Sequence, residues 1–131
     1  MRNIKSKNTK PEINVRKGLF AAGVRYRVNC KDLPGTPDIA VKKFKIAIFI
    51  NGCFWHGHQN CKKSKLPATN YEFWFNKISG NIAHDQKIIQ TYTDMNWTLV
   101  TIWQCEISTK EKLNNKINDI LLLIEKLKLL L

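Results

Sequence analysis

Three stretches of the chain begin with a helix-capping pattern and continue with apolar residues at helical spacing. The first starts at Thr9-Lys10-Pro11-Glu12, with proline in the first turn, where a helix tolerates it. We expect this helix to end near Ala22, because Gly23 follows. The residues that it is predicted to bury are Ile13, Leu19 and Phe20.

Two further helical regions are predicted in the second half of the chain. Thr69-Asn70-Tyr71-Glu72 opens a region that we expect to break near Gly80 and to continue to about Met95. Ser108-Thr109-Lys110-Glu111 begins a C-terminal helix over about residues 109–131. Its apolar stripe consists of Leu113, Ile117, Ile120, Leu121, Ile124 and Leu127.

Four short segments between these helices have the pattern of strands. Residues 24–28 alternate apolar and basic side chains, while Ile39–Val41, Ile46–Ile50 and Trp97–Trp103 are mainly apolar. The order of elements predicts an α/β fold in which a mixed sheet is flanked by helices. Because 131 residues leave room for one hydrophobic core, we expect a single domain over residues 1–131.

The second and third predicted strands have a consequence for function. If they form a hairpin around residues 42–45, Asp38 lies near the backbone of Ile50 and at the mouth of an irregular loop over about residues 51–68. A carboxylate, a carbonyl and a loop rich in histidine would then converge. Such a convergence is typical of a metal-dependent hydrolase.

The charge balance favours a polyanionic partner. Twenty-two Lys and Arg residues face ten Asp and Glu residues, so the formal net charge is +12 and the sequence pI is near 9.8. Nucleic acid is the polyanion that proteins with such an excess of positive charge most often bind. No apolar run approaches a membrane span, and the N-terminus lacks the pattern of a signal peptide, so we expect a cytoplasmic protein.

Reduced cysteines in that compartment indicate metal ligands or core residues rather than disulfides. Cys53, His56, His58 and Cys61 lie within nine residues, and Cys105 follows a predicted buried strand. This donor set predicts a closed, structural Zn²⁺ site, although spacing does not choose between the two histidines. Cys30 has no such neighbour and is expected to be a small core residue.

Several motifs together resemble the very short patch repair endonucleases. Taken alone, Asp38 fits an exposed turn and Glu12 fits a capping box. The resemblance runs in order from about Arg2 to about Lys110, and it is carried by Asn8-Thr9-Lys10-Pro11-Glu12, Leu33-Pro34-Gly35-Thr36-Pro37-Asp38, Gly52-Cys53-Phe54-Trp55-His56-Gly57-His58, Glu72-Phe73-Trp74 and Trp103-Gln104-Cys105-Glu106. It implies a fold like that of type II restriction endonucleases and Mg²⁺-dependent nicking of one strand at T·G mismatches left by deamination of 5-methylcytosine.

The resemblance also implies roles for particular residues. Asp38 would hold Mg²⁺ together with the backbone carbonyl of Ile50, and His56 would be the catalytic histidine with Glu12 beside it. The zinc ligands would be Cys53, His58, Cys61 and Cys105. The aromatic side chains that wedge between base pairs would be Phe54, Trp55 and Trp74.

The chain departs from the family at Asn51, where a histidine is frequent. Asparagine can hydrogen-bond a water or a phosphate but cannot take a proton at neutral pH. If that histidine is essential, the protein is slow or inactive; if His56 with a metal-bound hydroxide suffices, Asn51 is tolerated. The first alternative leaves a zinc-containing DNA-binding module that recognises mismatched or distorted DNA without cleaving it. By the same resemblance, residues 1–8 are expected to correspond to the later part of the family's N-terminal arm.

The resemblance has implications for partners as well. The substrate would be double-stranded DNA with a T·G mismatch, and the functional link would be to a cytosine-5 DNA methyltransferase. We expect a monomer of bacterial type that is associated with the nucleoid and has no membrane partner.

Overall fold

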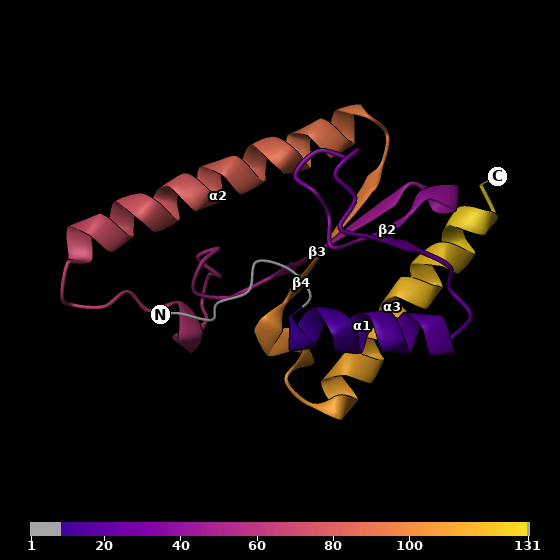
Figure 1. Ribbon diagram of the computed structural model, residues 1–131, viewed down its shortest axis with the longest axis horizontal. Coiled ribbons are helices and arrows are strands. Elements are labelled where there is room, and N and C mark those ends of the chain that lie inside the picture. The colour runs from indigo at the N-terminus through magenta and orange to yellow at the C-terminus, as the bar shows by residue number, and fades with distance from the viewer. Residues whose placement is uncertain (1–8, 131) are drawn as a thin grey trace.

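A four-stranded mixed sheet lies at the centre of the computed structural model, which describes residues 9–130 (Figure 1). The strands are β1 (Arg27–Val28), β2 (Ile39–Val41), β3 (Ile46–Asn51) and β4 (Thr98–Trp103), and they are adjacent in that order. β2 runs antiparallel to both of its neighbours, β1 and β3, while β3 and β4 are parallel. The expected α/β fold with a mixed sheet flanked by helices is confirmed.

The predicted hairpin between β2 and β3 is present. Ile39 pairs with Ile48, and Val41 pairs with Ile46. The chain reverses through a 3-10 turn at Lys42–Phe44, followed by Lys45 in a left-handed conformation with a φ of 55°. Because β4 runs parallel to β3, the segments that follow these two strands leave the sheet at the same edge.

Helices α1 (Lys10–Ala21) and α3 (Lys110–Lys128) lie on one side of the sheet (Figure 1). Side chains of β3 alternate in direction, and those that point toward these helices are apolar. The buried cluster on this side consists of Val15, Leu19, Val24, Ile39, Val41, Ile46, Ile48, Ile102, Ile107, Ile117, Ile120 and Ile124. The apolar stripe expected on the C-terminal helix therefore faces the core.

Helix α2 (Tyr71–Asp94) lies on the other side of the sheet from α1 and α3 (Figure 1). Tyr92 anchors its C-terminal part, because the fully buried ring meets Phe49 at 6.0 Å and the hydroxyl donates to the Pro34 carbonyl at 2.6 Å. The expected break near Gly80 is wrong: the helix is continuous over 24 residues. One glycine costs a helix only about 1 kcal/mol, which contacts on either side of it can offset.

Other local expectations also need correction. The ring of Phe20 is 60% exposed and lies 4.8 Å from the Arg25 guanidinium instead of in the core. The strand expected over residues 24–28 is reduced to β1, because only these two residues pair with β2. The Thr9 side chain makes no capping hydrogen bond, whereas Thr109 caps α3 by accepting from the Lys112 N–H at 3.2 Å.

The region over residues 69–72 starts its helix differently from the expected capping box. Asn70, not Thr69, is the capping residue of α2, and its φ of 56° places it in the left-handed region. Cys30 is buried, as expected. The expected N-terminal arm, residues 1–8, lies outside the described residues. Among residues 9–130, none of the helices combines the length and apolar character that a membrane crossing requires.

Candidate active site and metal centre

The position of Asp38 is fixed by backbone contacts on both sides. The N–H of Asn29 donates to the Asp38 carbonyl at 3.1 Å, and the N–H of Cys30 donates to the Pro37 carbonyl at 3.2 Å. The Asp38 carboxylate accepts a hydrogen bond from the N–H of Ile50 at 2.7 Å. The sequence expectation that Asp38 lies near the Ile50 backbone is therefore confirmed, and the aspartate is half-buried rather than exposed in a turn.

A second carboxylate lies beside it. Glu12 is only 3% exposed, and its negative charge acts on Asp38, while Arg16 contacts Glu12 at 3.4 Å. Burial raises the pKa of Asp38 to about 7; the Ile50 N–H opposes the shift and the Glu12 charge adds to it. A divalent cation bound beside Asp38 and Glu12 would stabilise the ionised form of Asp38. This position of Glu12 comes from tertiary packing and not from helix capping.

A cleft of about 510 Å³ lies between α2 and the sheet, and neither Asp38 nor Glu12 is among the residues that line it. Its lining includes Asn51, His56, Asp85 and Trp103. Asn51 directly follows Ile50, whose N–H is bonded to Asp38, so one wall of the cleft and the backbone that holds Asp38 are consecutive residues at the end of β3. His56 Nδ1 lies 2.7 Å from Asp85 Oδ2, and both side chains are partly exposed.

Asp85 is a candidate residue that the sequence analysis missed. It lies on α2, 29 residues after His56, and its pattern there is that of an ordinary polar helical position. The adjacency depends on how α2 crosses the sheet, so no local spacing could have identified it. A histidine with a fixed carboxylate partner can exchange a proton through its other ring nitrogen.

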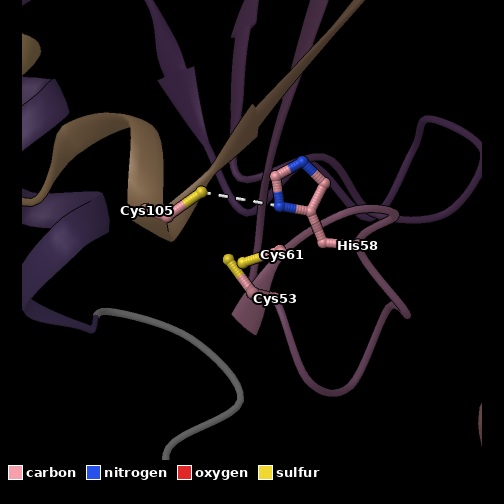
Figure 2. Close-up of side chains that lie close together, drawn as sticks. All are labelled: Cys53, His58, Cys61 and Cys105. Atoms are coloured by element: carbon pink, nitrogen blue, oxygen red, sulfur yellow. Dashed lines mark hydrogen bonds between the residues drawn. The ribbon is translucent and has the colours of Figure 1, made fainter. Parts of the chain in front are cut away.

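Four side chains form a separate cluster that could hold a metal ion (Figure 2). They are Cys53, His58, Cys61 and Cys105, and one ligand atom from each lies within 4.8 Å of the others. The Cys105 Sγ is 3.5 Å from His58 Nδ1. Figure 2 shows Cys105 entering from the segment after β4, opposite the three residues of the loop that follows β3.

Neighbouring groups fix the His58 ring of this cluster and shift the pKa values of two of its cysteines. The ring of His58 stacks on Trp103 with centroids 4.1 Å apart and an interplanar angle of 8°. Burial and the neighbouring Cys53 thiol raise the pKa of Cys105 to about 11, whereas a hydrogen bond from the Lys63 backbone lowers the pKa of Cys61. Of the two histidines that spacing left open, His58 joins the cysteines, and His56 pairs with Asp85.

The aromatic residues of the loop gather at the N-terminal part of α2. The rings of Phe54, Trp55 and Trp74 contact one another edge to face, with centroids 5.3–5.7 Å apart. Trp55 is 38% exposed, and the Asn81 side chain ties its backbone carbonyl to α2 at 2.8 Å. None of these three rings belongs to the main hydrophobic core. We call them the aromatic triad.

Acidic side chains at the edge of a mixed sheet, where two adjacent strands end, are the arrangement of endonucleases with a restriction-endonuclease-like fold, and this chain is of that class. The family described as DNA mismatch endonuclease Vsr matches residues 1–63. The chain belongs to this family and is a DNA endonuclease.

Relatives match over most of their lengths. The chain is 42% identical to the type II nicking enzyme V.NmeAIP of Neisseria meningitidis and 40% identical to the type II nicking enzyme V.XorIIP of Xanthomonas oryzae pv. oryzae. Both matches cover 92% of this chain and 88% of the relative. It is 36% identical to the DNA mismatch endonuclease Vsr of Escherichia coli, over 88% of this chain and 74% of that protein.

Proposed function

We propose that this endonuclease uses Mg²⁺ to nick one strand of duplex DNA beside a T·G mismatch that arises from deaminated 5-methylcytosine. The observation that carries the proposal is the Asp38 carboxylate, which is held by the Ile50 N–H at 2.7 Å beside the buried Glu12. The names of the relatives, which include nicking enzymes and a mismatch endonuclease, support the strand and substrate preferences.

The donor set around Asp38 fits a magnesium ion. Oxygen ligands suit this hard cation, and two adjacent carboxylates supply the negative charge that it needs. Asp38 and the backbone carbonyl of Ile50 would hold the ion, and Glu12 would lie beside it. When bound, Mg²⁺ neutralises charge on the scissile phosphate and lowers the pKa of a water molecule.

His56 would transfer the proton that the reaction requires. The Asp85 carboxylate accepts from Nδ1, which fixes the ring and leaves Nε2 to meet the substrate. Cleavage of a phosphodiester leaves an oxyanion on the 3′ side, and a histidine side chain within reach can protonate it. The position of His56 on the wall of the cleft, with Asn51 nearby, supports this role.

The aromatic triad would recognise the mismatch by wedging into the base stack. Unstacking a base step costs a few kcal/mol, and it costs less at a mismatch, so insertion itself favours damaged sites. Partial exposure of Trp55 and separation of the triad from the core support contact with DNA. The net charge of +12 would supply the attraction to phosphate, which does not depend on base sequence.

The cluster of Cys53, His58, Cys61 and Cys105 would hold a structural Zn²⁺. Three thiolates and one imidazole are a donor set that zinc prefers, and four protein ligands leave no position for a reactive water. Zinc would tie the loop that carries His56 and the triad to the segment after β4. We also propose cytoplasmic action on nucleoid DNA, a monomeric state and a functional link to a cytosine-5 DNA methyltransferase, as the family membership suggests.

A cleavage assay tests the proposal. A T·G duplex with a different dye on each strand is incubated with Mg²⁺ or with EDTA, and a matched T·A duplex is run beside it. We expect Mg²⁺-dependent cleavage of only the strand that carries the mispaired thymine. This cleavage should be lost in Asp38→Asn. Asp32→Asn is the matched control, because Asp32 lies in the same connection but pairs with Lys42 at the surface. Equal cleavage of both duplexes or both strands would contradict the proposed specificity.

Asn51 favours a second candidate function, a DNA-binding module that does not cleave. Its side chain is 9% exposed and lines the cleft with His56, yet an amide cannot accept a proton at neutral pH. In the same assay this alternative predicts tight binding of the mismatched duplex without a nick. If the wild-type protein does not cleave, Asn51→His should restore cleavage. If the wild-type protein already cleaves, the same change should at most increase the cleavage rate.

A further inference from the structure

The aromatic surface at the start of α2 extends beyond the triad. Phe73 lies with its ring centroid 5.1 Å from that of Trp74, at an interplanar angle of 79°. The Phe73 residue is 61% exposed, so this large apolar side chain remains mostly in contact with solvent. In Figure 1 the first turns of α2 project well past the strands, and the other aromatic residues there, Tyr71 and Phe75, are also exposed.

The neighbouring aromatic pair on the same turns differs from Phe73. Tyr71 and Phe75 stack on each other, with centroids 6.1 Å apart and an interplanar angle of 25°. Phe73 is instead continuous with the triad, because its ring contact leads through Trp74 to Phe54. A partner that meets the triad would therefore also meet Phe73.

Charge on the same helical face indicates the kind of partner. Lys77 follows Phe73 by four residues, so the two side chains are neighbours on the helix surface, and Lys77 is exposed. An open aromatic ring next to an ammonium group suits a nucleotide, in which a flat base is joined to a phosphate. An apolar protein partner would not require this cation.

We infer that Phe73 is a fourth aromatic contact to DNA, which stacks on a nucleobase that the triad has displaced at the mismatch. Lys77 contacts the phosphate of the same strand. This inference rests on the proposed function and adds a residue that determines specificity. Stacking of one base on an aromatic side chain is worth about 1–3 kcal/mol, which corresponds to roughly 5- to 150-fold in affinity. Because a matched duplex offers no displaced base, the gain applies to mismatched DNA.

The test compares two substitutions that keep an apolar side chain at this exposed position. Phe73→Leu removes the ring, and Phe73→Trp retains one. We expect Phe73→Leu to weaken binding of a T·G duplex about 10-fold and that of the matched T·A duplex less than about twofold, with Phe73→Trp close to wild type. Phe20→Leu is the matched control, because Phe20 is equally exposed on α1. Lys77→Gln should weaken both duplexes alike and reduce the salt dependence of binding.

A fluorescent 2-aminopurine next to the mismatch gives a second measurement. Stacking of this base on Phe73 should make its emission differ between the wild-type and Phe73→Leu complexes. Unchanged discrimination and unchanged emission in Phe73→Leu would overturn the inference while the wild-type preference for T·G still upheld the proposed function. A wild-type protein without any preference for the mismatch would overturn both.

Discussion

Nδ1 of His56 lies 2.7 Å from Oδ2 of Asp85, and this contact joins the loop after β3 to the middle of α2. A carboxylate accepts at this position, so it selects the ring nitrogen that faces the substrate and holds the imidazole in place. Through this pair, helix α2 positions the histidine that is proposed to transfer the proton.

The first prediction concerns Asp85→Asn. An amide can present either its oxygen or its nitrogen to His56, so the ring loses the partner that fixes its orientation. We expect the nicking rate of the DNA-bound enzyme to fall about 100-fold, with binding of the T·G duplex unchanged. Single-turnover rates measured across pH check this. Asp94→Asn should be neutral, because Asp94 lies at the end of the same helix and accepts from Gln90 Nε2 at 2.9 Å. A wild-type rate in Asp85→Asn would remove the proposed role of the pair.

The second prediction concerns the pH dependence of Mg²⁺ binding. Burial, with the nearby Glu12 charge as a further cause, raises the pKa of Asp38 to about 7. The ordinary value is about 3.9, so between these two pH values the folded protein keeps a proton that the unfolded chain releases. This group therefore lowers folding stability as pH rises from about 4 to about 7 and has no further effect above that range.

Mg²⁺ must displace the same proton, so its affinity should rise about 10-fold per pH unit up to about pH 7 and then level off. Calorimetric titration in buffers of different ionisation enthalpy would detect the released proton. Glu12→Gln removes a charge that raises the Asp38 pKa, so the midpoint should move to lower pH. A Mg²⁺ affinity that is constant from pH 5 to pH 8 would contradict this account.

The third prediction concerns zinc. Cys105→Ala removes the ligand that comes from the other side of the cluster, and we expect the purified protein to lose its zinc and to melt at a lower temperature. Metal analysis and thermal unfolding with and without chelator provide the measurements. Cys30→Ala is the control, since Cys30 is buried elsewhere and should keep full zinc content. Equal zinc content in the two variants would refute the assignment of Cys105 as a ligand.

The fourth prediction compares two glycines. Gly57 has a φ of 60°, and a Cβ built there would lie 2.6 Å from Ile82 and 2.9 Å from Ile78. Gly57→Ala should destabilise the protein by about 2 kcal/mol, because both the backbone and the packing of the loop on α2 are strained. Gly80→Ala has no atom within 4 Å of the new Cβ and lies inside a helix, so it should stabilise by about 0.5–1 kcal/mol. Urea unfolding of the zinc-loaded proteins would show a lower free energy of unfolding for Gly57→Ala and a higher one for Gly80→Ala than for the wild type.

Local patterns predicted most elements because the information lies in neighbouring residues. The apolar stripe of α3 and the apolar run of β3 depend only on neighbouring residue types and their spacing, so both were found. The continuity of α2 through Gly80 and the exposure of Phe20 were predicted wrongly. Both depend on which surfaces meet in the folded chain, and residue type alone does not specify that.

Within the candidate site, the sequence determined the chemical types and the local geometry. The clustered cysteines and histidines indicated a metal, and the hairpin placed Asp38 beside the Ile50 backbone. Only the tertiary structure decided that Glu12 lies against Asp38 and that Asp85 pairs with His56. It also placed His58 with the cysteines, a choice that spacing left open and the family resemblance implied. These contacts join residues 26 to 47 positions apart in the chain, as between Glu12 and Asp38 or between His58 and Cys105. Their formation depends on how α1, α2 and the segment after β4 pack on the sheet, and no short sequence pattern encodes that packing.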